Sequence, residues 1–324
     1  MPTIFIMGGT GHIGGAMLDL LAGSSHPVDV SVLVLARDQE KAANVTAKYP
    51  QVHPVVGDFA NLNLIETTYR GVDIVINAGL DITHDEMLKA VLRGLQSREG
   101  NGGSAMKPYF IHTSSAYLDC DLREPGGTKS EKVWDDIEDS EQLVSMPGTA
   151  VHRVTDKLSV RQPYPITMPA LFQCLRAFHS AFVIGEGENA VGMIHVRDFA
   201  RMNMVLVDNA LATLTGSNNK TEPPFPVWGE NAYYFASAHG AIGGSGHEIK
   251  SVSTAEVARQ VLSGGDNYDP DTAPPPLDSW ATHIAQGQGA NLRIWASKMR
   301  RLGWVLEHVS FFETMDDVIP AYLR

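Results

Sequence analysis

Three glycines near the start of the chain, Gly8, Gly11 and Gly14, have the spacing and the neighbours of a phosphate-binding turn. An apolar run at residues 3–7 precedes them, and a helical pattern at residues 13–21 follows them. Glycine at these places permits a sharp bend, close backbone approach to a pyrophosphate, and tight packing of the helix, whose N-terminal N–H groups face the phosphate. Because the turn opens a βαβ unit, it predicts a dinucleotide site, with a purely structural glycine turn as the alternative. The turn residues expected to bind the cofactor are Gly8, Thr10, Gly11, His12, Ile13 and Gly14.

The residues after the second predicted strand, 28–35, indicate which dinucleotide binds. An NAD site usually has an acidic residue there, which accepts a hydrogen bond from the ribose 2′-OH. This chain has Arg37, whose guanidinium can pair with a 2′-phosphate. Asp38 could accept from the ribose, but capping of the next helix explains it without a ligand. The sequence therefore favours NADP(H) over NAD(H), with a solvent-exposed surface arginine as the structural alternative.

The first third of the chain alternates strand and helix patterns, which is typical of an α/β protein. Apolar strand patterns fall at residues 3–7, 28–35, 52–56, 72–77 and 109–113. The alternation predicts a doubly wound (Rossmann) parallel sheet of at least five strands with helices on both faces. Ligands bind such sheets at the carboxyl ends of the strands, where the motifs of this chain lie.

Beyond the fifth strand the pattern breaks. Residues 119–141 contain nine acidic and three basic residues, which predicts a solvated excursion from the core. We expect residues 1–169 to form the nucleotide-binding core and residues 170–324 a small helical C-terminal substrate lobe, packed on the same domain. In the lobe, Asp198 is expected to cap a helix that runs to about residue 209.

Composition narrows the classes of partner. Asp and Glu number 37 against 25 Lys and Arg, a net charge of −12, which argues against a nucleic-acid surface. Two cysteines, Cys120 and Cys174, cannot build a disulfide framework or a cysteine-rich zinc site. The longest apolar stretch, at residues 30–36, is far shorter than a membrane span, and no secretory signal is visible. We expect a cytosolic protein with a small-molecule substrate, no metal and no membrane contact; a homodimer is left open.

Six short motifs follow one another along the chain: Gly8-Gly9-Thr10-Gly11-His12-Ile13-Gly14, Val56-Gly57-Asp58, Asn77-Ala78-Gly79, Ile111-His112-Thr113-Ser114-Ser115, Ile194-His195-Val196-Arg197-Asp198-Phe199-Ala200 and Ser297-Lys298-Met299-Arg300-Arg301-Leu302-Gly303-Trp304. In this order they resemble the short-chain dehydrogenase/reductase superfamily. The extended and atypical branches, which include NAD-dependent epimerase/dehydratase and NmrA-like proteins, are the most similar.

The resemblance implies roles for several residues. Asp58 matches the residue that contacts the adenine amino group, and Asn77–Gly79 match the strand end that lines the cofactor. Ser114 or Ser115 matches the serine that holds the substrate carbonyl or hydroxyl, although strand-end capping would explain both serines. Lys157 matches the lysine that holds the nicotinamide ribose.

The family's catalytic tyrosine has no counterpart at the usual place. It precedes the lysine by four residues, where this chain has Arg153, and a guanidinium is a poor general acid. Tyr117 is the first candidate for a substitute, although ordinary packing in the pocket wall also explains it. His152 is a weaker candidate, because a surface or capping role explains it as well. His112 and His195 are expected to be buried structural histidines.

The segment after Lys157 is also shorter than the family pattern. The family inserts a further strand and a loop before the next helix, whereas only residues 158–168 separate Lys157 from Pro169. Pro163 and Pro165 suit an edge or a loop. The sixth strand is therefore expected either at residues 166–168 or not at all.

The leading interpretation is an NADP(H)-dependent oxidoreductase, or a related epimerase/dehydratase-type enzyme, that acts on a small organic carbonyl or alcohol. One alternative is a catalytically silent NADP(H)-binding regulatory protein. Another is a cofactor pocket reused for non-redox isomerisation or cyclisation. The missing tyrosine favours the two alternatives, whereas the glycine turn fits all three.

Overall fold

The protein is described by a computed structural model. It describes residues 1–23, 29–79, 85–99, 108–114, 126–145, 160–161, 173–174, 177–179, 182–190, 192, 194–217, 223–229, 232–237, 250–253, 257, 289–291 and 293–307. Within these residues no helix has both the length and the apolar character needed to cross a bilayer.

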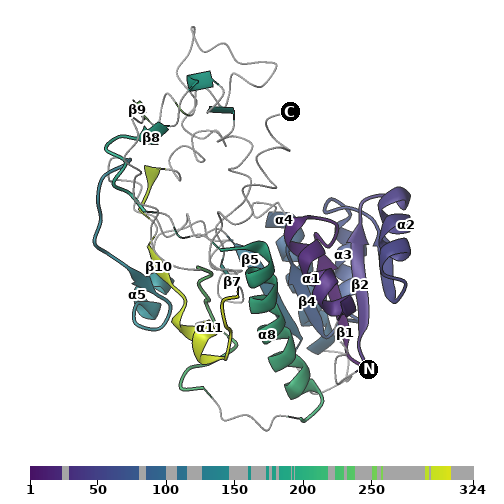
Figure 1. Cartoon of the computed structure of the whole chain (residues 1–324). Helices are drawn as coiled ribbons and strands as arrows, with labels where there is room; N and C mark the ends of the chain where they lie inside the picture. The colour runs from purple at the N-terminus through teal and green to yellow at the C-terminus, as the bar shows by residue number, and fades with distance from the viewer. Residues whose placement is uncertain are drawn as a thin grey trace.

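A parallel sheet forms the centre of the molecule, as the sequence predicted (Figure 1). Its strands are β1 (Thr3–Met7), β2 (Ser31–Ala36), β3 (Val52–Val56), β4 (Ile74–Asn77), β5 (Tyr109–Ser114) and β7 (Val160–Arg161). The order across the sheet is β3-β2-β1-β4-β5-β7, and every neighbouring pair is parallel. The chain therefore winds outward in both directions from β1, which is the doubly wound topology.

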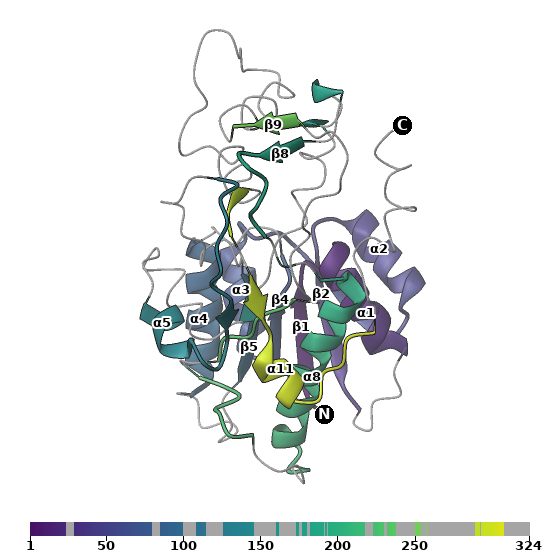
Figure 2. The same ribbon diagram turned by 60° about the vertical axis from the view of Figure 1, so that its left-hand side comes forward.

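Helices cover both faces of this sheet. Figure 2 shows α1 (His12–Gly23) and α8 (Val196–Leu214) on one side of the strands, and α3 (Leu62–Tyr69) and α4 (Asp85–Glu99) on the other. Because side chains alternate along a strand, β1 serves both layers. Ile4 and Ile6 join the core with α1 and α8, whereas Phe5 and Met7 pack with α3 and α4.

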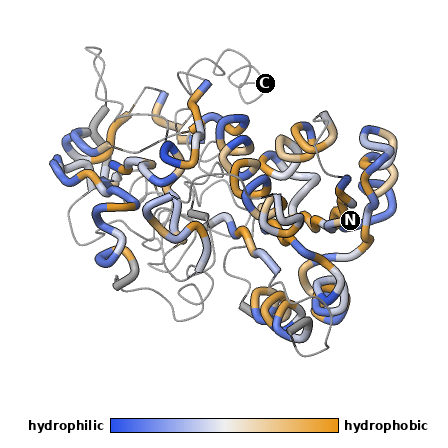
Figure 3. The backbone as a smooth tube through the Cα atoms, turned by 90° about the horizontal axis from the view of Figure 1, so that it is seen from below, coloured by the Kyte–Doolittle hydropathy of each residue, from blue (hydrophilic) through white to orange (hydrophobic). Residues whose placement is uncertain are grey.

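The hydropathy of the helices follows from this two-layer burial. Figure 3 shows orange and blue residues alternating around the helical turns, as expected when one face packs on a sheet and the other meets solvent. On α1, Met17, Leu18 and Leu21 are buried. The fold class predicted from the strand and helix pattern is thus confirmed, whereas the boundary at residues 169 and 170 stays a prediction.

A sixth strand of the sheet is present at residues 160–161, whereas residues 166–168, where the sequence placed it, lie outside the described residues. Val160 and Arg161 form β7, which pairs in parallel with the end of β5 through Thr113 and Ser114. The alternative of no sixth strand is therefore wrong, and sequence reasoning did not find this strand because two residues carry no hydrophobic periodicity that could mark them.

Part of the acidic segment 119–141 is also not a solvated excursion. Trp134–Asp135 form β6, which pairs in parallel with β10 (Ile294–Trp295), and Asp136 is completely buried. The two oxygens of Asp136 accept hydrogen bonds from the backbone N–H groups of Lys298 (2.9 Å) and Phe235 (3.0 Å). The acidic composition therefore concealed a carboxylate that joins three distant segments of the chain.

Burial and hydrogen bonding act on Asp136 in opposite directions. Desolvation raises the pKa of its carboxyl to about 7, although the two backbone N–H groups and the nearby Lys298 ammonium favour the ionised form. Burial likewise lowers the pKa of Lys298, against the attraction of Asp136 and Asp135. Buried opposite charges of this kind are costly to separate once they are in place.

Helix α8 begins one turn earlier than expected. His195, not Asp198, is its N-cap, and His195 Nδ1 accepts from the Arg197 N–H at 3.2 Å. Asp198 lies in the first turn, is buried, and bonds to the Arg201 guanidinium and to the Glu307 N–H (3.1 Å). When several polar residues lie near the start of a helix, the sequence does not show which of them is the N-cap, because it does not fix where the first turn begins.

We predict that Asp136→Asn lowers the free energy of unfolding by about 2–4 kcal/mol, because one backbone N–H would face an amide N–H and Lys298 would lose its counter-charge. Urea denaturation measures the change. Glu138→Gln is the matched control: it removes the same charge at an exposed site two residues away and should change stability by less than about 0.5 kcal/mol. Equal effects of the two substitutions would contradict the structural role of Asp136.

Candidate functional site

The glycine turn bends where β1 meets α1, and it does so against the end of β4. Gly8 has φ +76°, a conformation that glycine adopts without strain, and the Gly11 N–H donates to Gly8 O at 2.9 Å. A Cβ atom on Gly8 would lie 2.6 Å from Ala78 O and 2.7 Å from Gly79 N. The first glycine is therefore required both for the bend and for the close approach of the next loop.

Gly14 has a different function, inside the first turn of α1. A Cβ atom there would lie 2.6 Å from Gly9 Cα, so any larger residue would push the helix off the turn. Gly11 is less crowded, since the nearest atom to its added Cβ would be Gly8 O at 3.2 Å. This crowding brings the start of α1, with its unpaired N–H groups, close to the strand end, as an anion site requires.

A solvent-open cavity of about 860 Å³, which includes its solvent-facing part, lies above this turn. It is lined by Gly8, Thr10, Gly11, His12, Ile13, Leu35, Arg37, Lys41, Asp58, Phe59, Ala78 and Gly79. Nine of these were expected as cofactor residues from the sequence. Two other expected residues, Gly14 and Asn77, lie behind the lining rather than in it.

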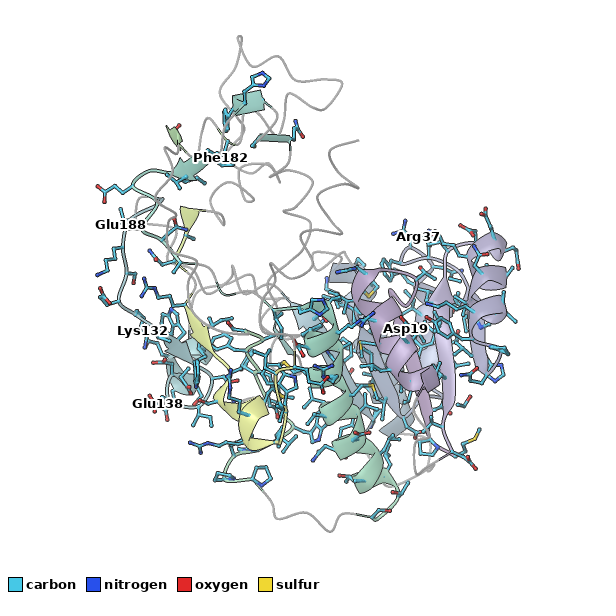
Figure 4. All side chains as sticks on the ribbon, in the orientation of Figure 1. Asp19, Arg37, Lys132, Glu138, Phe182 and Glu188 are labelled. Atoms are coloured by element: carbon cyan, nitrogen blue, oxygen red, sulfur yellow. The ribbon has the colours of Figure 1, made fainter. Side chains whose placement is uncertain are left out.

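Arg37 and Lys41 place two cations at the β2 side of the cavity. Arg37 follows β2 directly and is exposed, and Figure 4 shows it at the upper end of the sheet. Lys41 lies in the first turn of α2 (Gln39–Lys48). Asp38 caps this helix, and its carboxylate accepts from the Lys41 N–H at 2.8 Å, which confirms the capping interpretation. Sequence reasoning missed Lys41, although its spacing of four residues from Arg37 was visible.

Asp58 and Phe59 also line the cavity, just after β3, the neighbour of β2. Asp58 is exposed, and its Oδ1 accepts from the N–H groups of Ala60 (3.0 Å) and Asn61 (3.1 Å), which fixes the turn. The Phe59 ring lies against Gly79: a Cβ atom there would be 2.6 Å from the ring. Phe59 was not singled out from the sequence, and its position directly after Asp58 is the signal that could have found it.

Asn77 ends β4 and is buried, with 1 % of its surface exposed. Its Oδ1 accepts from the Gly79 N–H at 3.0 Å, and its Nδ2 lies 2.9 Å from His112 Nδ1. Asn77 therefore shapes the loop that lines the cavity without lining it. His112 and His195 are both buried, as expected for structural histidines.

The predicted catalytic residues are only partly described. Ser114 is the last residue of β5, at the carboxyl edge of the sheet, next to the strand that ends in Asn77. Ser115, Tyr117 and Lys157 lie outside the described residues, as do His152 and Arg153. In the described part of the chain, no three His, Cys, Asp or Glu side chains gather as a metal site would need.

We predict that Gly14→Ala weakens cofactor binding at least tenfold, because the added methyl group displaces the start of α1 from the phosphate position. Calorimetric titration with NADPH measures this loss. Gly15→Ala provides the control: its methyl group would meet nothing nearer than 3.8 Å, and alanine favours the helix. Weakening of similar size in both variants would show that the crowding at Gly14 has no bearing on the site.

Comparison with known proteins agrees with this geometry. Residues 4–94 match the family described as the saccharopine dehydrogenase NADP-binding domain. The chain is 27% identical to a protein named oxidase ucsJ from Acremonium sp. The match extends over 301 residues and covers 83% of each of the two chains. An uncharacterized protein from Saccharomyces cerevisiae is 25% identical over 271 residues, covering 78% of this chain and 82% of its own.

Solved structures share the fold of this chain. Yeast methylglyoxal/isovaleraldehyde reductase Gre2 in complex with NADPH has a TM-score of 0.52 and 17% identity, over 99% of this chain and 98% of its own. Triphenylmethane reductase from Citrobacter sp., in complex with NADP(H), has a TM-score of 0.56 and 14% identity, over 97% and 99%. The fold that the motif resemblance implied is confirmed: the chain shares the fold of these NADP(H)-complexed reductases, and its residues 4–94 match an NADP-binding domain.

Proposed function

We propose that the protein is an NADP(H)-dependent oxidoreductase that transfers a hydride between the nicotinamide and a small organic carbonyl or alcohol. The observation that carries the proposal is the cavity itself. The cavity has two features. One is a tight turn that requires glycine, because Cβ atoms would clash there, and the other is a pair of cations, Arg37 and Lys41, that follow β2. Pyrophosphate fits the first feature and a 2′-phosphate fits the second.

Residues of this chain would divide the binding of NADP(H) among them. The N–H groups at the start of α1 would hold the pyrophosphate, and Arg37 with Lys41 the 2′-phosphate. One carboxylate oxygen of Asp58 accepts the backbone hydrogen bonds of its turn, and the other oxygen would accept from the adenine amino group. Ala78 and Gly79 would form the wall along which the cofactor extends toward β5.

Chemistry would then take place beyond the end of β5. NADPH, when bound, supplies the hydride for the carbonyl carbon, and the carbonyl oxygen takes up a proton as it becomes the hydroxyl. Ser114 or Ser115 would hold that oxygen, and Tyr117 would donate the proton. Lys157 would hold the nicotinamide ribose and lower the cost of proton transfer through its positive charge. Arg153 retains its proton at any working pH and cannot serve as the acid.

The names of similar proteins support a redox reaction. One relative is named an oxidase, and two structures with this fold are reductases that hold NADPH or NADP(H). Structures of dTDP-glucose 4,6-dehydratase and UDP-glucose 4-epimerase share the fold as well, so an epimerase/dehydratase-type reaction is the nearest variant of the proposal.

Arg153 favours a second candidate, a protein that binds NADP(H) to regulate a partner without turning over substrate. The two functions differ in one measurement. A reductase consumes NADPH when a suitable aldehyde or ketone is added, whereas a regulatory binder shows the same affinity for the cofactor and no consumption.

We predict that Arg37→Ala weakens NADPH binding by ~1–3 kcal/mol, because a charge-assisted contact to the 2′-phosphate is lost, and leaves NADH binding almost unchanged. Lys41→Ala should show the same selectivity with a smaller loss, since its ammonium is a point charge without the guanidinium fork. Calorimetry with both cofactors decides the matter. Equal losses for NADPH and NADH would refute the role in 2′-phosphate binding.

We predict slow NADPH-dependent reduction of small aldehydes and ketones, because the usual acid is replaced by Arg153. Tyr117→Phe should abolish this activity while NADPH affinity stays the same, and absorbance at the NADPH band measures the rate. Turnover that survives in Tyr117→Phe would exclude this tyrosine as the acid. Loss of turnover in Arg153→Ala, with cofactor affinity retained, would overturn the chemical argument against arginine.

A further inference from the structure

Asn77 and His112 form a polar pair inside the sheet, directly behind the loop that lines the cavity. They are neighbours across β4 and β5, with Asn77 Nδ2 2.9 Å from His112 Nδ1, and their exposed fractions are 1 % and 0 %. Ile76 and Ile111, which precede the pair on the two strands, are apolar and buried, and Phe110 stacks on the His112 ring with 5.7 Å between ring centroids. Polar groups buried this deeply cost free energy unless their hydrogen bonds are satisfied.

The direction of each hydrogen bond in the pair follows from one backbone group. The Gly79 N–H can only donate, so the atom of Asn77 at 3.0 Å from it must be the carbonyl oxygen. The other end of the amide is then the NH₂ group, which also can only donate. His112 Nδ1 must therefore accept with its lone pair, and the proton of the neutral ring must sit on Nε2.

This chain of contacts ends at the wall of the cavity. The Asn77 oxygen holds the Gly79 N–H, and the adjoining Ala78 carbonyl packs against Gly8, where a Cβ atom would lie 2.6 Å away. Both Ala78 and Gly79 line the cavity. If the amide turned over, an NH₂ group would face the Gly79 N–H, and the loop would lose the contact that holds it against the glycine turn.

We infer that Asn77 and His112 are positioning residues for the cofactor, and that His112 performs this role through one tautomer, the form with a bare Nδ1 and a proton on Nε2. His112 orients the Asn77 amide, and the amide holds Gly79 in the conformation that completes the cavity wall. The inference rests on the proposed binding of NADP(H) in this cavity, but the tautomer itself can be observed without cofactor.

The tautomer is tested by nitrogen NMR of the full chain labelled with ¹⁵N-histidine, in which the signals of His112 are those lost in His112→Asn. The expected spectrum shows Nδ1 as an unprotonated acceptor and Nε2 as protonated. In Asn77→Asp the carboxylate can only accept, so the proton should move to Nδ1 and the pattern should reverse. A protonated Nδ1 in the wild-type protein would overturn the inference.

Cofactor affinity tests the positioning. His112→Leu leaves the Asn77 NH₂ group without its acceptor and should weaken NADPH binding about tenfold. His112→Asn places a carbonyl oxygen near the position of the lost Nδ1, and should bring the affinity back to within about threefold of wild type. The matched control is Ile111→Ala, which removes packing from the opposite face of the same strand without touching a hydrogen bond or the His112 ring; it should lower the unfolding midpoint but change NADPH affinity less than about twofold.

Two results would contradict the inference: equal losses of affinity in His112→Leu and Ile111→Ala, or a folded His112→Asn protein that recovers nothing. Circular dichroism and thermal unfolding show which variants are folded. A wild-type protein that binds no NADP(H) would instead overturn the proposed function, and the ring nitrogen signals would still decide whether the pair holds the inferred tautomer.

Discussion

The approach of two backbone turns, Gly8 and Ala78–Gly79, is the constraint on which the rest of the site depends. With Ala78 O 2.6 Å from where a Cβ atom of Gly8 would be, neither turn can move without the other. The parallel pairing of β1 with β4 sets this approach, since Met7 and Asn77 are partners at the ends of the two strands. Sheet topology thus fixes the cavity floor, and the start of α1 is held over it by the second crowded glycine, Gly14.

Charge within this cavity opposes the charge of the molecule as a whole. The chain carries a net charge of −12, which would repel a phosphorylated dinucleotide, yet Arg37 and Lys41 lie at the cavity wall. Screening at physiological salt confines electrostatic attraction to about 8 Å, so these two neighbouring cations outweigh distant carboxylates. The helix N-terminus adds a fixed positive end that does not depend on side chains. Binding of an anion is therefore a local property, which explains why composition alone could not reveal this site.

Short-range patterns in the sequence predicted the sheet and most of the cavity. Strand and helix periodicity located β1 to β5, and the spacing of Gly8, Gly11 and Gly14 located the cavity, because both features are encoded within a few residues. Long-range contacts could not be predicted in the same way. Asp136 is held by the backbone of Phe235 and Lys298, which lie 99 and 162 residues away in the chain. Its neighbours in the sequence are acidic and therefore predicted a solvent-exposed segment. Phe59 was missed for a similar reason, since only the fold brings its ring against Gly79.

Asp136 and Asn77 are both buried and both hold backbone N–H groups, and their difference in charge follows from what lies next to them. Asp136 is an acid beside Lys298, so the charge that its carboxylate carries when ionised is balanced inside the core. Asn77 likewise holds a backbone N–H group, that of Gly79, but it does so behind the cavity. A carboxylate at this position would lie close to the phosphates of an anionic cofactor. An amide accepts from Gly79 without bringing that repulsion, but its NH₂ group then requires an acceptor. His112 supplies that acceptor with its bare Nδ1, so the pair can hold the Gly79 N–H without adding negative charge beside the cavity.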